Sequence, residues 1–132
     1  MIKRLAGPVL LLSVSALADA PADFVARYAA QGGVATSALS PPRGEAFYRQ
    51  ERAHPAGAKR SCAGCHGADP RQAGRTPVGK RIEPLAPAVN GARFTDAAKV
   101  EKWFRRNCMD VLQRECSAQE KGDFVAWLSQ LK

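Results

Sequence analysis

The chain has 132 residues, a formal net charge of +8 and only 7% aromatic residues. This length allows one small domain with a modest core, which a prosthetic group or a cross-link would strengthen. The basic residues are scattered, with no run of five, so the charge does not predict a nucleic-acid-binding tail.

Residues 1–18 have the pattern of a secretory signal peptide. A basic start at Lys3 and Arg4 precedes a short apolar run that ends in Ala-Leu-Ala. The run is too short for a membrane anchor. Cleavage after Ala18 removes two cations and no acid, so the net charge falls from +8 to +6. We therefore expect a periplasmic protein that has no stable membrane insertion after cleavage and does not bind nucleic acid.

Two helices are predicted in the first half of the chain. Residues 19–39 form an N-terminal extension or short helix, with helical residues over 21–30. A second helix is predicted over 40–53, with Ser40 as its N-cap. Gly44 lies one turn before Tyr48 in this helix, so another helix can approach closely at the glycine.

The second half begins with a long segment that has no helical or strand period. Residues 67–93 are rich in Gly, Pro and basic residues, and a stretch of this kind is unusual inside a small domain. It indicates a segment wrapped around a group that is not protein. A third helix is predicted over 95–112, and a fourth begins at Ser117 with Glu120 completing a capping box. The predicted fold class is all-α, about four helices with long loops.

The motif that carries chemistry is Cys-Ala-Gly-Cys-His at residues 62–66. C-x-x-C-H is the attachment motif of a c-type haem. The thiols of Cys62 and Cys65 reach the two vinyl groups of one porphyrin, and His66 is then the proximal iron ligand. We expect one covalently attached haem c.

Three kinds of site other than a haem could use these cysteines. A thioredoxin-like site requires a βαβ setting, which the pattern lacks. A zinc site could use all four cysteines, but it is a poor choice in an exported chain. A plain disulfide framework is the third alternative.

The distal side of the iron is assigned from the periodicity of the third helix. At 100° per residue, Val100, Trp103, Phe104 and Val111 form one apolar stripe. Asn107 falls about 20° from Val100, whereas Met109 falls about 180° away. We therefore predict that Asn107 is buried at the centre of this stripe as a distal ligand or hydrogen-bond donor.

Alternatives to Asn107 remain open at this point. Met109 and His54 are the rivals that would make a permanently six-coordinate electron carrier, and Asn90 is a weaker rival. A structural hydrogen bond from Asn107 to the backbone is the non-functional alternative.

Cys108 and Cys116 remain once the haem has taken its pair. In an oxidising compartment two remaining cysteines usually bond to each other. The loop they would close stabilises the fold by about 2.6 kcal/mol in the chain-entropy model. We expect a structural disulfide between Cys108 and Cys116. The alternative is a disulfide whose reduction and oxidation switch the ligation of the haem iron. Lys80, Arg81 and Arg93 are candidates to contact the haem propionates, or are simply solvated.

From about residue 40 onward, the sequence resembles the Sphaeroides haem protein family of class I c-type cytochromes. The resemblance rests on four stretches: CAGCH, GKRIEPLAPAVNGARFTD, KWFRRNCMDVLQREC and SAQEKGDFVAWLSQL. It implies a monohaem cytochrome c domain over 40–132, with Asn107 as distal ligand to a high-spin haem. It also implies a disulfide between Cys108 and Cys116.

The resemblance further implies that the asparagine leaves the iron on reduction, and that dioxygen or nitric oxide then binds. It implies a dihaem cytochrome c or a membrane cytochrome b as electron donor. We expect an electron-transfer and diatomic-binding cytochrome. The alternative is an enzyme that reduces dioxygen or nitric oxide, which would require turnover.

Overall fold

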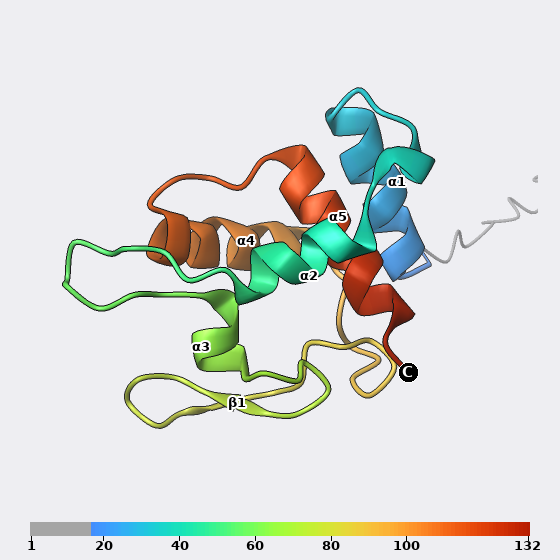
Figure 1. Cartoon of the computed structure of the whole chain (residues 1–132). Coiled ribbons are helices and arrows are strands. Elements are labelled where there is room, and N and C mark those ends of the chain that lie inside the picture. The colour runs from blue at the N-terminus through green and yellow to red at the C-terminus, as the bar shows by residue number, and fades with distance from the viewer. Residues whose placement is uncertain (1–16) are drawn as a thin grey trace, which may run out of the picture.

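The computed structural model describes residues 17–132, so the expected signal peptide lies outside the described residues except for its last two. The helices in this part are α1 (Pro21–Gln31), α2 (Pro41–Arg49), α3 (Cys62–His66), α4 (Ala97–Leu112) and α5 (Ala118–Gln130), with a 3₁₀ turn η1 at Thr36–Ala38 (Figure 1). Two short strands, β1 (Gly74–Arg75) and β2 (Arg81–Ile82), pair antiparallel. Within residues 17–132 no helix is long and apolar enough to cross a membrane.

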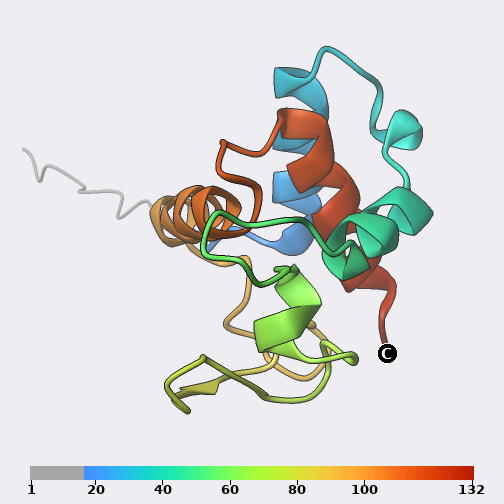
Figure 2. The same cartoon turned by 60° about the vertical axis from the view of Figure 1, so that its left-hand side comes forward.

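Helix α5 is the centre of the packing, with α1 and α2 against it (Figure 2). The close approach predicted at Gly44 is confirmed, because a Cβ added there would lie 2.1 Å from the carbonyl oxygen of Asp123. Asp123 is buried and accepts hydrogen bonds from the backbone N–H of Ser40 and the Nε of Arg43. The predicted caps at Ser40 and Ser117 are also present.

Helix α1 is part of the core. Its Phe24 and Tyr28 are fully buried, and the Tyr28 ring meets Phe104 of α4 edge-on at 5.8 Å between centroids. Phe104 in turn packs on Phe124 of α5 at 5.7 Å. The sequence boundary at residue 40 therefore does not separate two packing units, because the core of residues 40–132 is closed by side chains from α1.

Helix α2 ends at Arg49, four residues earlier than predicted. The chain leaves the helix because Arg52 and Arg60 form an antiparallel backbone bridge, each donating its N–H to the other's carbonyl at 2.8 Å. The Arg52 guanidinium also lies 5.0 Å from the Phe47 ring centroid. This bridge closes a loop that returns the chain to the start of α3.

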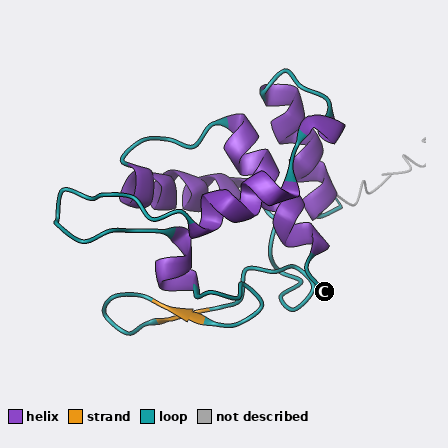
Figure 3. Ribbon diagram, viewed as in Figure 1, coloured by secondary structure: helices purple, strands orange, loops and turns teal. Residues whose placement is uncertain are grey.

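The segment predicted to lack regular structure contains the small β1–β2 hairpin below α3 (Figure 3). Gly79 has φ +82°, which the tight turn requires. Farther along, the backbone N–H groups of Leu85 and Ala86 both donate to the carbonyl of Pro70. The segment is thus folded back on itself under α3.

Candidate functional site

The Cys-Ala-Gly-Cys-His motif forms one helical turn, α3, which the sequence had not predicted as a helix. Ser61 caps it by accepting a hydrogen bond from the N–H of Gly64 at 3.0 Å. Cys62 and Cys65 are three residues apart, so their thiols lie on one side of the turn. Both thiols are free in the structure and half-buried.

Contacts above and below hold this turn in place. From α2, the Tyr48 hydroxyl donates to the carbonyl of Gly67 at 2.5 Å and Arg49 donates to that of Ala68 at 2.8 Å. From β1, Gly74 lies so close that an added Cβ would be 2.1 Å from the carbonyl oxygen of Cys65. Only a glycine fits at that position in β1, because the contact is with backbone.

The surroundings of the turn favour the neutral forms of His66 and Cys62. Burial, with a further contribution from Arg93, lowers the pKa of His66 to about 4. The imidazole is therefore neutral at neutral pH, the form that binds iron. Burial raises the pKa of Cys62 to about 11. This is opposite to the low pKa of redox-active thiols and argues against a thioredoxin-like site.

The structure confirms the predicted stripe of α4 at Val100, Phe104 and Val111, which pack on the core, and corrects it at Trp103 and Asn107. Cys108 and Val111 are buried, but Trp103 is 42% exposed and Asn107 is exposed in the polypeptide. The buried side is rotated toward Phe104 and Cys108 because the Phe104 ring packs on α1 and α5. Asn107 thus lies on the flank of the buried side and not at its centre.

An ion pair relates this flank of α4 to the haem-attachment motif. Arg60 lies two residues before Cys62, and its guanidinium binds the Asp110 carboxylate. Asp110 is three residues after Asn107, on the same flank of α4. The flank that carries Asn107 is therefore tied to the segment that leads into α3.

The rivals for the distal position are placed differently. Met109 is 49% exposed, and the helical period puts it away from Asn107. His54 lies in the loop after α2, where its Nδ1 accepts a hydrogen bond from the N–H of Ala56. Asn90 uses both ends of its amide within its own loop, donating to Pro84 and accepting from Ala92.

Cys108 and Cys116 are bonded to each other, with Cα atoms 5.7 Å apart. The bond joins the last turn of α4 to the residue before the cap of α5. Gln113 between them adopts the left-handed conformation, φ +59°, that turns the chain back. Because both thiols are used, a zinc site built from all four cysteines is excluded.

The candidates for propionate contacts have unequal surroundings. Arg93 is half-buried near His66, and its guanidinium donates to the carbonyls of Glu83 and Pro84. Arg81 is exposed and paired with Glu83, and Lys80 is exposed. Of these three candidates, Arg93 alone contributes to the lowered pKa of His66.

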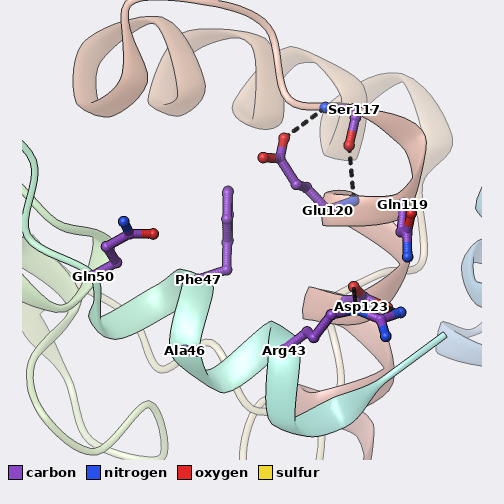
Figure 4. A pocket seen from close by; sticks show the side chains of 8 residues that line it. All are labelled: Arg43, Ala46, Phe47, Gln50, Ser117, Gln119, Glu120 and Asp123. Carbon is purple, nitrogen blue, oxygen red and sulfur yellow. Dashed lines mark hydrogen bonds and ion pairs between the residues drawn. The ribbon is translucent and has the colours of Figure 1, made fainter.

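A groove elsewhere, between α2 and the start of α5, has a volume of about 450 Å³ (Figure 4). The Phe47 side chain points into it. At its edge, the backbone N–H of Ser117 donates to the Glu120 carboxylate, and the backbone N–H of Glu120 donates to the Ser117 hydroxyl. No residue of the Cys-Ala-Gly-Cys-His motif or its predicted distal partners lines this groove. We therefore do not place the chemistry there.

Comparison with known proteins shows which family and which relatives the chain resembles. Residues 34–128 match the domain of unknown function DUF1924. The chain is 43% identical to cytochrome c-type protein SHP of Cereibacter sphaeroides, over 95% of this chain and 91% of that protein. It is 44% identical to cytochrome c'' of Methylophilus methylotrophus, over 64% of this chain and 60% of that protein.

Two solved structures share the fold. Oxidized SHP, described as an oxygen-binding cytochrome c, aligns with a TM-score of 0.76 and 40% identity, over 86% of this chain and 99% of that one. Oxidized cytochrome c'' aligns with a TM-score of 0.74 and 37% identity, over 85% of this chain and 94% of that one. The all-α cytochrome architecture is therefore confirmed.

These relatives imply a haem, and the residues of α3 fit one. The motif offers two free thiols on one side of a turn beside a neutral imidazole. In contrast, residues 17–132 contain no group of three His, Cys, Asp or Glu side chains that could hold a metal ion alone. The donor set suits an iron that arrives within a porphyrin.

Proposed function

We propose the following function for this chain, which belongs to the Sphaeroides haem protein family: an exported monohaem cytochrome c that transfers electrons and binds dioxygen or nitric oxide when reduced. The observation that carries the proposal is the α3 turn, with two free thiols and a neutral histidine. A haem supplies a one-electron couple and a coordination position for a diatomic ligand.

The protein's own residues have distinct roles in this proposal. Cys62 and Cys65 would hold the haem through thioether bonds, and a ring nitrogen of His66 would bind its iron. Burial of His66 keeps the imidazole neutral and thus available as a ligand. Tyr48 and Gly74 fix the turn, so that the histidine keeps its orientation.

Asn107 is proposed as the labile distal ligand. Its amide oxygen is a hard, weak donor, which suits ferric iron better than ferrous iron. Reduction of a bound haem would therefore weaken the hold of Asn107, whose amide would then be available to donate a hydrogen bond to a diatomic ligand. The link between Arg60 and Asp110 supports this role, because it keeps the Asn107 flank of α4 beside the α3 segment.

Absorption spectra of the ferric and ferrous protein, with and without carbon monoxide, test the proposal. We expect a Soret band, and a ferrous spectrum that carbon monoxide changes. A low-spin ferrous spectrum that carbon monoxide leaves unchanged would contradict the labile ligand. Absence of a Soret band after production with the haem-attachment machinery would show that the protein does not bind haem and is not a cytochrome.

Two substitutions on α4 separate the candidate ligands. Asn107→Val is expected to keep the haem attached but to change the ferric spin state, because an aliphatic side chain cannot ligate iron. Met109→Leu is the matched control and is expected to leave the spectrum unchanged. The opposite pattern would assign the distal position to Met109 and make the protein a six-coordinate electron carrier.

Production with the native leader tests export and the fate of the leader. We expect the protein in the periplasmic fraction with its N-terminus at Asp19, as the predicted cleavage after Ala18 requires. Retention in the membrane fraction with an intact N-terminus would show that residues 1–18 act as an anchor.

A further inference from the structure

Most of the unpaired positive charge of residues 17–132 lies on one helix, α4. Nine basic side chains are in ion pairs with nine of the chain's 12 acidic side chains. Arg52, Arg75 and Arg93 donate to backbone carbonyls instead. Within residues 17–132, the basic side chains left in neither group are Lys80, Lys99, Lys102, Arg105, Arg106 and Lys132. Four of these six lie within eight residues of α4.

Of the acids outside the ion pairs, Glu115 alone is free of backbone capping and lies near one of these cations, Arg105. Residues 1–16 contain no Asp or Glu. Of the three acids outside the ion pairs, Asp23 and Asp96 accept backbone hydrogen bonds at the starts of α1 and α4. The third, Glu115, is exposed and lies with Arg105 around a small hollow beside Cys116.

Three of the cations on α4 share one exposed side. At 100° per residue, Lys99, Lys102 and Arg106 lie within about 60° of one another. This side is opposite the buried Cys108, and all three residues are exposed. The Trp103 ring orients two of them, because the Lys102 Nζ and the Arg106 Cζ lie 5.9 and 5.1 Å from its centroid.

We infer that this basic face of α4, formed by Lys99, Lys102 and Arg106 with Arg105 at its border, docks the carboxylate-rich surface of a protein partner. That this partner is an electron donor rests on the proposed function. Unpaired cations on one face attract a surface of opposite charge and accelerate encounter. The face is on the same helix as Asn107, so a docked partner lies beside the distal flank of the site.

An acidic protein fits this face better than an anionic membrane does. A helix that binds membranes turns an apolar side toward the acyl chains. In α4 the apolar side is turned into the core, where Phe104 packs on Tyr28 and Phe124. The basic face itself offers charge with one half-exposed indole.

Docking is tested with the haem-loaded protein and a fluorescein-labelled peptide of ten glutamates, by fluorescence anisotropy at low ionic strength. We expect Lys102→Gln/Arg106→Gln to weaken binding about five-fold or more, since each exposed pair contributes up to about 1 kcal/mol. The control Lys59→Gln/Lys132→Gln removes the same charge from exposed positions and should change binding less than about two-fold. The difference should vanish at high salt.

Electron transfer is measured separately, by stopped-flow reduction with a flavodoxin as an acidic donor. We expect the α4 double variant to be about five-fold slower than the control variant at low salt. Peptide binding without reduction of the wild type would leave the docking face intact and overturn the proposed electron-transfer function. Equal loss of peptide binding in both double variants would overturn the docking face. So would wild-type binding to phosphatidylserine vesicles, lost in the α4 variant, with no binding to the peptide.

Discussion

At the scale of single residues, two glycines allow backbone segments to approach each other closely. Gly44 lets α2 meet the backbone of α5, and Gly74 lets β1 meet the backbone of α3. In both places an added Cβ would be 2.1 Å from a carbonyl oxygen. A backbone atom cannot rotate away as a side chain can, so the helices or the hairpin would have to separate.

Gly44→Ala is therefore expected to lower the free energy of unfolding by at least about 2 kcal/mol, as overpacking against backbone requires. Gly91→Ala is the matched control. Its added Cβ would meet no atom within 4 Å, so the change should stay within about 0.5 kcal/mol. Guanidinium unfolding of the haem-loaded proteins measures both values. Equal stabilities of the two variants would contradict the close packing at Gly44.

At the scale of elements, polar contacts between helices hold α4 in place. Glu101 of α4 accepts from the Tyr28 hydroxyl of α1 and from the Lys121 ammonium of α5, at 2.5 and 2.8 Å. Burial by itself raises the pKa of Glu101, but these hydrogen bonds outweigh it and leave the pKa lowered. The three helices are thus joined at one ionised carboxylate.

The lowered pKa of Glu101 predicts a pH-dependent stability. A group with a depressed pKa in the folded state stabilises the fold above its unfolded pKa, and this contribution is lost as the pH falls through the folded pKa. We expect Glu101→Gln to cost about 1 kcal/mol at pH 7. The difference from wild type should shrink as the pH falls below the folded pKa of Glu101. Guanidinium unfolding across that range measures it, and a difference independent of pH would contradict the ionised role.

The pair between Arg60 and Asp110 predicts a second effect on α4. Both side chains are partly exposed, so Arg60→Gln or Asp110→Asn should cost less than about 1 kcal/mol of stability. Each should nevertheless shift the ferric spin equilibrium in the same direction, because each loosens α4 from the α3 segment. The double variant should add little to either single one.

The control for this pair is Glu51→Gln, which removes the partner of the exposed Lys59 in the same loop. Absorption spectra of the ferric proteins report the spin equilibrium. If Glu51→Gln shifts it as much as Asp110→Asn does, the effect belongs to the loop or to overall charge. The ion pair between Arg60 and Asp110 would then have no specific effect on the ferric spin equilibrium.

At the scale of the whole molecule, the N-terminal helix completes the core. Phe24 packs between Tyr28 and Phe94, with ring centroids 6.2 and 6.0 Å away. It thereby joins α1 to the segment that precedes α4. The domain consequently includes residues that the sequence had assigned to an extension.

Phe24→Ala is expected to destabilise the haem-loaded protein by about 3 to 5 kcal/mol, as for other fully buried aromatic side chains. Val78→Ala is the control, since Val78 is 91% exposed. Thermal or guanidinium unfolding compares the two. A cost below about 1 kcal/mol for Phe24→Ala would mean that α1 does not contribute to the core.

Features that depend on neighbours within one or two turns were predicted correctly from the sequence. The caps at Ser40 and Ser117 belong to this class. The close approach at Gly44 was also predictable, because a glycine inside a helix has few other uses. The haem cofactor implied by the relatives likewise follows from five consecutive residues.

Other features depend on residues far apart in the chain. Arg60 and Asp110 are 50 residues apart, and Tyr28 and Glu101 are 73 apart. Packing of Phe104 on Tyr28 and Phe124 likewise turns the buried side of α4 toward Cys108 and leaves Asn107 on its flank. The bridge between Arg52 and Arg60 similarly ended α2 early. A helical period shows which residues share a face, but the direction in which that face points is set by the elements that pack against it.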